Sequence, residues 1–389
     1  MLSLRHHQMT PARSVGAARR LALTAACGFL VVASAVALQQ QSTSGAVEVS
    51  PGLSKKSILR GIEGTAGSFE VQTKVDMAAV GAPDLAFTVT GTAVSQLLFN
   101  GEGMLTRTDL EGVETLAFLG ARNDSGKLFN LTLDGARTAM TYSEGDVTGE
   151  GALVLSDPFK TFRTVTMFVE NGGTLTKLFV GPDWKELAET RAVRRGGAPK
   201  GVLGALLARE LMAEQVNRDD KDPDPARNYA PEHARLADLV GDFKVEVGDG
   251  EASARLCQAR LVGNGRFLLY VSGVVAQPEP SGAESGEADP STGPTLRPES
   301  VDQCTMLGFD SVRRVFQMFQ VSGAEGPVHY CEGAPRKDGS LLLRDLVGGL
   351  KVKCTPGVGG GQDWEWTVGR SDPVEIRLRP VSTAQGPAR

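Results

Sequence analysis

The stretch QLLFNGEG at residues 96–103 returns as QARLVGNG at residues 258–265, which indicates that the chain holds two copies of one unit. The number of residues that separates matching positions changes at two places only. The first copy has a longer connection around residues 76–85, and the second copy has an insert over residues 275–303. Changes confined to loops are typical of two copies of one fold. Further matches flank the repeated stretch: GSFEV at 67–71 with GDFKV at 241–245, LG at 119–120 with LG at 307–308, and YSEG at 142–145 with YCEG at 330–333.

The repeat divides the chain of 389 residues into two domains and their connections. Each copy has about 150 residues, which is an ordinary size for one domain with its own core. We therefore predict the following organisation: a signal peptide or membrane anchor over residues 1–45, a first repeat over 46–195, a linker over 196–230, a second repeat over 231–381 and a tail over 382–389.

Within each copy the apolar residues alternate with polar ones, as they do in strands with one buried face. Phe243, Val245 and Val247 alternate with Lys244 and Glu246, for example. Gly, Asn and Asp separate such runs, which is typical of antiparallel hairpins. Many meandering strands favour a closed barrel, because closure removes exposed sheet edges. The predicted fold class is all-β, with two tandem antiparallel barrels, each of which can begin with a short helix.

Four glycines of the repeated stretch stand between apolar runs in each copy: Gly101 and Gly103, matched with Gly263 and Gly265. Glycine adopts positive φ without the strain that a β-carbon causes. We therefore predict that these glycines form tight hairpin turns. The alternative is that they let a ligand approach the backbone.

The linker contains one stretch with helical periodicity, residues 201–216. Its apolar residues recur every three or four positions, which predicts an amphipathic helix. Such a helix could pack on a barrel wall or lie on a membrane surface, and the first is favoured. The apolar residues are Leu203, Leu206, Leu207, Leu211 and Met212.

The second copy resembles a bacterial family, the domain of unknown function 1579. The resemblance covers residues 231–380 and rests on four motifs: Pro231-Glu232-His233 with LVGDF at 239–243, GNGRF at 263–267, LGFD at 307–310 and YCEG at 330–333. It implies a lipocalin-like barrel and no activity. Residues 58–195 resemble a diverged copy that lacks the Pro-Glu-His opening and has Ala121-Arg122 in place of Phe309-Asp310.

The amino-terminal segment has the pattern of an export signal. Arg19 and Arg20 precede an uncharged apolar stretch over residues 21–38, and Ala35-Val36-Ala37 offers a cleavage site. The stretch is also long enough to act as an uncleaved membrane tether. Either alternative predicts an exported protein in the periplasm, at the cell surface or secreted, which retention would anchor to the inner membrane. Cys27 is interpreted as a small residue of this stretch.

Four of the five cysteines fall in the second copy: Cys257, Cys304, Cys331 and Cys354. In an exported protein they favour two disulfides, with three pairings open. A zinc site of four thiolates is less favoured because no Cys-x-x-Cys spacing is present. Free buried thiols are the third alternative.

No motif assigns a chemistry to the chain. The net charge of −5 is spread over interspersed acids and bases, which argues against nucleic acid as a partner. His233 is interpreted as a surface or capping residue and His329 as a strand residue, and no cofactor or metal is predicted. We expect a barrel that binds a small hydrophobic ligand or a protein partner. The alternatives are a structural protein with solid barrels, in which Trp364 and Trp366 are core, and, less favoured, an enzyme; no oligomeric state is predicted.

Overall fold

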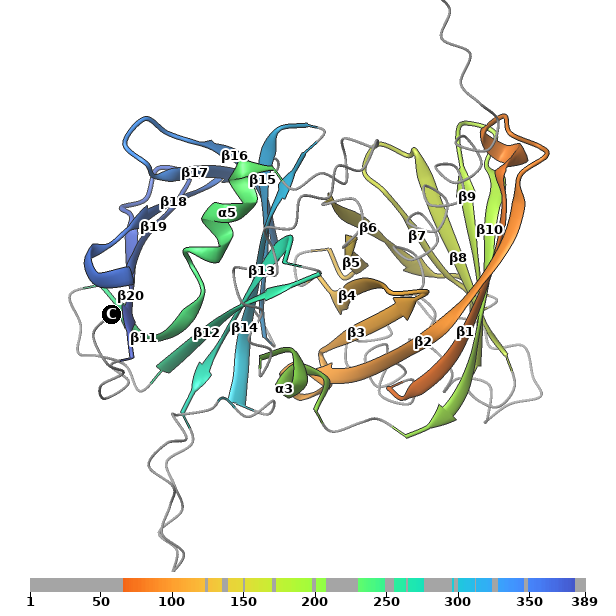
Figure 1. The fold of residues 1–389 in the computed structure, drawn as a ribbon, viewed down its shortest axis with the longest axis horizontal. Helices are drawn as coiled ribbons and strands as arrows, with labels where there is room; N and C mark the ends of the chain where they lie inside the picture. Colours follow the sequence, from red (N-terminus) through yellow and green to blue (C-terminus); the bar gives the residue numbers. More distant parts are fainter. Residues whose placement is uncertain are drawn as a thin grey trace, which may run out of the picture.

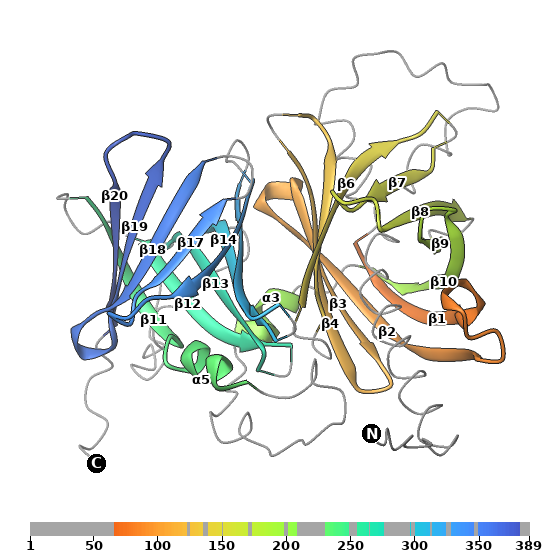
Figure 2. The ribbon, with the colours of Figure 1, turned by 90° about the horizontal axis from the view of Figure 1, so that it is seen from above.

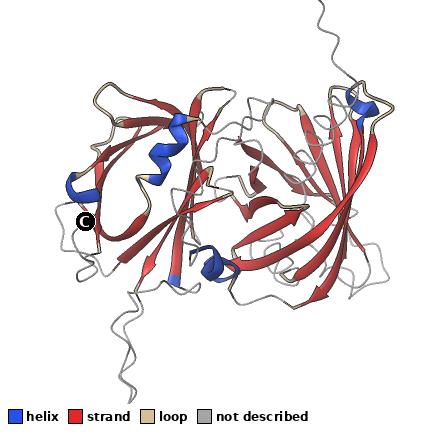
Figure 3. Cartoon of the chain, in the orientation of Figure 1, coloured by secondary structure: helices blue, strands red, loops and turns tan. Residues whose placement is uncertain are grey.

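The structure is a computed structural model that describes residues 66–381, except for 198–200, 208–229, 249–254, 276–295 and several gaps of one to four residues. Strands account for most of it (Figure 3). The amino-terminal stretch 21–38, Cys27, Leu211, Met212 and the tail lie outside the described residues. Within these residues, no helix is both long and apolar enough to cross a bilayer.

The first copy is a closed barrel of ten antiparallel strands (Figure 1). Each strand pairs with the next along the chain, and the last pairs with the first. The short 3-10 helices η3 (Met77–Val80) and η4 (Phe99–Gly101) follow the first and second strands. The strands are β1 (Ser68–Asp76), β2 (Ala86–Leu98), β3 (Gly103–Leu110), β4 (Val113–Ala121), β5 (Leu128–Asp134), β6 (Ala139–Val147), β7 (Leu153–Ser156), β8 (Phe162–Val169), β9 (Gly173–Val180) and β10 (Lys185–Gly196).

The second copy is a closed barrel with the same order of ten strands. The helix α5 (Pro231–Ala237) precedes it and lies at one end of the barrel (Figure 2). The predicted tandem of antiparallel barrels is thereby confirmed. The strands are β11 (Gly241–Val247), β12 (Arg255–Val262), β13 (Phe267–Val274), β14 (Val301–Asp310), β15 (Val315–Ser322), β16 (Val328–Pro335), β17 (Leu341–Asp345), β18 (Leu350–Pro356), β19 (Gln362–Val368) and β20 (Val374–Pro380), with the 3-10 helix η7 (Val358–Gly360) before β19.

Strand pairing matches the repeated glycine motifs of the two copies differently from the sequence comparison. The last pair before each hairpin loop is Leu98 with Gly103 in one copy and Val262 with Phe267 in the other. Gly103 therefore lies in a strand, and the predicted turn is wrong for this residue. Glycine is required at this position for a different reason: a β-carbon there would lie 2.5 Å from the Phe118 ring.

The other three glycines of the motif adopt the predicted positive φ. Gly101 has φ 91°, Gly263 has φ 58° and Gly265 has φ 79°. Gly101 and Gly265 are both the third residue of a four-residue loop, whereas the first position is Gly263 in one copy and Phe99, with φ 54°, in the other. A bulky residue held at positive φ is uncommon. Phe99 accepts this conformation because its ring is buried against Phe118 between the barrels.

The two barrel interiors differ in side-chain size. By strand pairing, Thr176 of the first barrel is equivalent to Trp364 of the second, and Thr106 is equivalent to Tyr270. The threonines of the first interior are at most 3% exposed, so its middle is packed nearly solid. Four of them pair across strands, in the hydrogen bonds Thr73–Thr190 at 2.9 Å and Thr166–Thr176 at 3.0 Å. Buried members are Thr73, Thr106, Thr108, Thr115, Thr132, Thr164, Thr166, Thr174, Thr176 and Thr190.

A hydrophobic core also lies between the barrels, formed by their outer walls and α3 (Val202–Leu207). Figure 1 shows α3 between the two barrels. It falls within the helix predicted over residues 201–216 and packs on barrel walls, as favoured; the remainder of that stretch lies outside the described residues. Both helix ends are bound by side chains: Gln96 Oε1 accepts from Leu203 N at 2.9 Å, and Arg260 Nε donates to Leu207 O at 2.8 Å. Gln96 lies on β2 and Arg260 on β12, its counterpart strand, so each barrel holds one end of the helix.

Equivalent residues of the two copies meet in this core. The rings of Tyr142 and Tyr330 stack with centroids 6.3 Å apart, and each hydroxyl donates to a glutamate two residues on, Glu144 at 3.0 Å and Glu332 at 2.7 Å. The Tyr-Glu pairs of both copies are therefore part of one core between the barrels.

The helix α5 is capped by the buried ring of His233. The ring is 0% exposed, and Nδ1 accepts a hydrogen bond from Ala230 N at 2.9 Å. The capping interpretation is confirmed, whereas the surface position is wrong, because the ring packs edge-on against Phe309 at 5.7 Å inside the barrel end. Burial, aided by Arg266, lowers the pKa of His233 to about 4.

We expect the stability of the protein to fall in acid through His233. The folded pKa of about 4 lies below the ordinary 6.5 of the unfolded chain, so the contribution of the neutral ring is complete above pH 6.5 and is lost as the pH falls toward and below 4. The full loss corresponds to about 3 kcal/mol. Urea titrations between pH 7 and pH 4 of the protein and of His233→Gln, which keeps an acceptor but does not titrate, measure the difference. Equal pH profiles would contradict it.

Candidate functional site

The second barrel contains a cavity of about 240 Å³ at the end away from α5. Its lining comes from inward-facing residues of β11 to β14 and of β19 and β20, the strands that flank the barrel closure. The lining residues are Val245, Val247, Arg255, Cys257, Tyr270, Ser272, Gln303, Thr305, Trp364, Trp366, Ile376 and Leu378.

One wall of the cavity is aromatic. The indoles of Trp364 and Trp366 stack at 6.2 Å, and Tyr270 meets Trp364 edge-on at 5.4 Å. Gln362 fixes two of these rings, since its Oε1 accepts from the Tyr270 hydroxyl at 2.9 Å and from Trp364 Nε1 at 3.1 Å. Its Nε2 donates to Leu239 O at 3.0 Å, which ties the wall to the chain segment after α5. The wall is therefore rigid and suits a flat apolar group.

The facing wall carries polar side chains. Ser272 and Thr305 line the cavity from β13 and β14. From Thr305 a row of inward-facing polar residues continues through Gln320 on β15 to His329 on β16. The Nδ1 atom of His329 lies 3.2 Å from Asp345 Oδ2. These residues can therefore form hydrogen bonds on the side of the interior that lies opposite the indoles.

Within the described part of this interior, buried polar atoms on β15 and β19 have no hydrogen-bond partner in the protein. They are the indole N–H of Trp366, a donor, and Oε1 of Gln320, an acceptor on a residue that is 7% exposed. Buried polar atoms are satisfied in the great majority of native structures. The interior can therefore bind a molecule that combines an apolar body with a polar group.

The four cysteines predicted to form disulfides are free, buried thiols in the structure. They lie on β12, β14, β16 and β18, so a strand separates each from the next. Strands two apart are about 9.5 Å from each other, whereas disulfides need Cα atoms within about 7 Å. Cys304 faces the core between the barrels, and the other three face the barrel interior.

Only Cys257 of these four lines the cavity. Burial raises the pKa of all four thiols to about 12, so the reactive thiolate is suppressed. Over the described residues, no group of three or more His, Cys, Asp or Glu side chains is placed to hold a metal ion.

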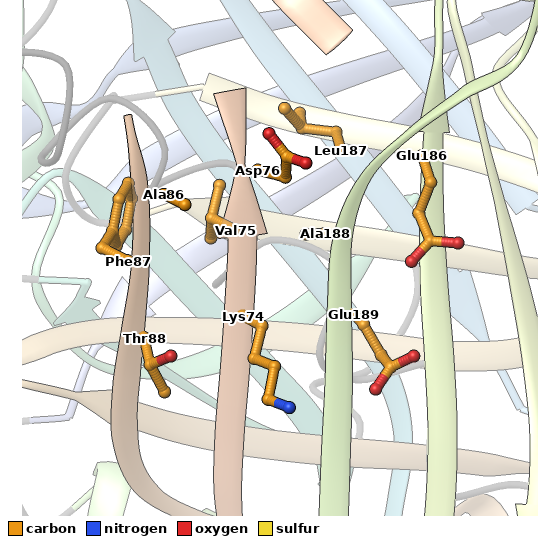
Figure 4. Close-up of a pocket in the computed structure, with 10 residues that line it drawn as sticks. All are labelled: Lys74, Val75, Asp76, Ala86, Phe87, Thr88, Glu186, Leu187, Ala188 and Glu189. Atoms are coloured by element: carbon orange, nitrogen blue, oxygen red, sulfur yellow. The ribbon is translucent and has the colours of Figure 1, made fainter. Parts of the chain in front are cut away.

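A larger, open hollow of about 590 Å³ lies on the first barrel at the ends of β1, β2 and β10 (Figure 4). Figure 4 shows Lys74 in line with Thr88 and Glu189, its partners on the neighbouring strands. Glu186 and Glu189 also bind Lys177, at 2.9 and 3.7 Å. Both glutamates of this hollow thus have a cationic partner within the sheet, so the hollow is a weaker candidate than the cavity of the second barrel.

Sequence reasoning placed Trp364 and Trp366 on one strand face, but it did not single out Ser272, Gln303 or Thr305. These polar residues occupy inward positions of strands with mostly apolar inward neighbours. A break in the apolar alternation is the signal that would have found them.

Comparison with known proteins adds no functional assignment. The chain matches no family model and no curated protein, so the resemblance to domain of unknown function 1579 stays a prediction.

Several solved structures show distant likeness. One is a protein of unknown function from the DUF3598 family of Nostoc punctiforme, 10% identical over 81% of this chain and 94% of that one, with a TM-score of 0.21. A putative outer membrane protein from Bacteroides fragilis is 9% identical over 80% and 96%, with a TM-score of 0.15. Transferrin binding protein B from Haemophilus parasuis is 6% identical over 80% and 75%, with a TM-score of 0.18. At these TM-scores none carries an argument about function.

Proposed function

We propose that the protein binds a small, mainly apolar molecule in the cavity of its second barrel. The observation that carries the proposal is the cavity of about 240 Å³ between the Trp364 and Trp366 indoles and the polar residues of β13 and β14. Sites for drug-sized ligands have roughly 300–1,000 Å³. The favoured ligand is smaller than these: a flat apolar body with one group that can accept a hydrogen bond from the Trp366 indole.

The first barrel supports a second, structural role. Its buried threonines fill the middle of the barrel, and its outer wall supplies half of the core between the barrels. This packing favours a solid barrel that holds the second one in place. We therefore propose a solid, structural role for the first barrel and ligand binding for the second.

We also propose that this binding takes place outside the cytoplasm. The charges and apolar stretch of residues 13–38 support export. The free thiols differ from the disulfides that export favours. They are compatible with an oxidising compartment because burial, with a pKa of about 12, keeps them in the unreactive protonated form.

Tryptophan fluorescence tests the cavity directly. The chain has three tryptophans, and Trp184 is the one outside the second barrel. In a Trp184→Phe background, which keeps an aromatic ring beside Arg163, the emission reports the cavity. We expect 2-naphthol to quench it saturably, because the ligand stacks on the indoles.

A cavity-filling variant provides the control. Ser272→Phe places a ring in the cavity and should weaken 2-naphthol binding at least tenfold, whereas Lys351→Phe on the exposed outer face of β18 should leave it unchanged. Linear, unsaturable quenching, or equal affinity in both variants, would overturn the proposal.

A further inference from the structure

Gln362 lies between the cavity of the second barrel and the segment that follows α5. It is the first residue of β19, faces the barrel interior and is 1% exposed. It does not line the cavity itself, but its side chain binds two residues that do, Tyr270 and Trp364. It also binds the carbonyl of Leu239, which lies between α5 and β11. One buried side chain thus joins the aromatic wall to the chain after α5.

Hydrogen-bond chemistry permits one orientation of the Gln362 amide. A backbone carbonyl can only accept, so Nε2 must point to Leu239 O, at 3.0 Å. The oxygen Oε1 then points to the Tyr270 hydroxyl at 2.9 Å and to Trp364 Nε1, which can only donate, at 3.1 Å. The amide therefore cannot turn over without losing hydrogen bonds to the wall and to Leu239.

The helix α5 packs in the same core as the aromatic wall. Leu236 of α5 is 0% exposed and belongs to the hydrophobic cluster that contains Tyr270 and Trp364. A displacement of α5 that moved the Leu239 carbonyl would leave the Gln362 amide nitrogen buried without its partner. Because an unpaired buried donor destabilises the folded chain, the docked position of α5 and the fixed position of the wall favour each other.

The first barrel has no such link. Strand pairing gives threonines as the equivalents of Gln362, Trp364 and Tyr270, in this order Thr174, Thr176 and Thr106. The hydroxyl of Thr174 is buried without a hydrogen-bond partner among the described residues. The link therefore belongs to the barrel that contains the cavity.

We propose that Gln362 is a positioning residue that couples α5 to the cavity, so that ligand binding and the docking of α5 stabilise each other. The inference rests on the proposed function and adds a regulation of the same site. Such coupling is reciprocal: the factor by which docked α5 raises the affinity for the ligand equals the factor by which the ligand favours docked α5. A bound ligand therefore slows the local opening of α5.

Hydrogen exchange of the full chain, followed by mass spectrometry, tests the coupling. We expect saturating 2-naphthol to slow exchange over residues 231–240 at least threefold, whereas β16 and β17, which do not line the cavity, keep their rates. Equal slowing of α5, β16 and β17 would show general stabilisation and overturn the proposal.

Gln362→Met assigns the effect to the amide, because methionine has a similar length but forms none of the three hydrogen bonds. We expect the dissociation constant of 2-naphthol to rise at least tenfold and saturating 2-naphthol to leave the exchange of α5 unchanged. Gln362→Asn, whose amide is too short to bridge the wall and Leu239, is a second variant that keeps a polar group and should behave in the same way. Slowing of α5 as large as in the parent would overturn the role of Gln362.

Exchange without ligand separates this proposal from the proposed function. Gln362→Met should exchange residues 231–240 at least threefold faster than the parent, because Leu239 loses its donor. Gln303→Met is the matched control: Gln303 lines the cavity near the start of β14, whereas α5 packs at the other end of this strand, against Phe309. Equal α5 rates in these two variants would overturn the link. If they differ and the parent fails to bind 2-naphthol, the ligand proposal fails and the link from α5 to the wall stands.

Discussion

Gly333→Val is expected to unfold the second barrel. A β-carbon at Gly333 would lie 1.9 Å from the carbonyl oxygen of Leu342 on the neighbouring strand β17, and backbone atoms of Leu343 are 2.9 Å away. Backbone cannot move aside as a flexible side chain can, so the strands must separate. We expect a loss of about 4 kcal/mol or more, at the upper end for single substitutions.

Urea unfolding followed by circular dichroism measures this loss. Gly197→Val is the matched control, because a β-carbon there meets no atom within 4 Å and its φ is not positive. It should change stability by no more than about 0.5 kcal/mol. Similar midpoints for both variants would contradict the close approach of β16 and β17.

Phe319→Ala is expected to weaken both barrels together. Phe319 is 0% exposed on the outer wall of the second barrel, and its ring lies 5.5 Å from Phe129 and 6.0 Å from Tyr142 of the first. Truncation of a buried phenylalanine costs about 3–5 kcal/mol. Because the lost contacts belong to both barrels, we expect one shared unfolding transition at lower urea rather than a shift in one barrel.

Phe159→Ala provides the comparison, since this ring is 80% exposed. Its stability should match that of the parent. If Phe319→Ala were equally silent, or shifted only the signal of the second barrel, the core between the barrels would not contribute to folding as described.

The fold could be predicted from the sequence because its information is local. Alternation gave the strands, and the repeated Tyr-x-Glu-Gly motif, with Gly145 and Gly333 at equivalent places, gave the duplication. In the sequence alignment Gly103 was matched with Gly265, which is two residues away from the match that strand pairing gives. The two glycines look alike in sequence, but each is required for a different reason. At Gly103 a side chain would clash with the Phe118 ring, whereas at Gly265 a side chain would be strained by the positive φ of the backbone.

The packing of the barrels against each other could not be predicted so easily. Outward-facing Phe129, Leu131 and Leu133 occupy a strand whose seven residues are all buried. A strand that is buried on both faces usually has a continuous run of apolar residues. In this strand Asn130, Thr132 and Asp134 interrupt the run, so the sequence gives no sign that both faces are buried. A ligand-binding barrel was expected, but the polar residues that line the cavity were not identified, because in sequence they look like ordinary strand residues.

The contact of Tyr142 with Tyr330 joins equivalent positions of the two copies. Two identical subunits of a dimer share one sequence, so a substitution that opens the interior of one subunit opens the interior of the other as well. Two copies within a single chain are free of that constraint. The two interiors of this protein differ accordingly, because buried threonines occupy the first and the second contains a cavity.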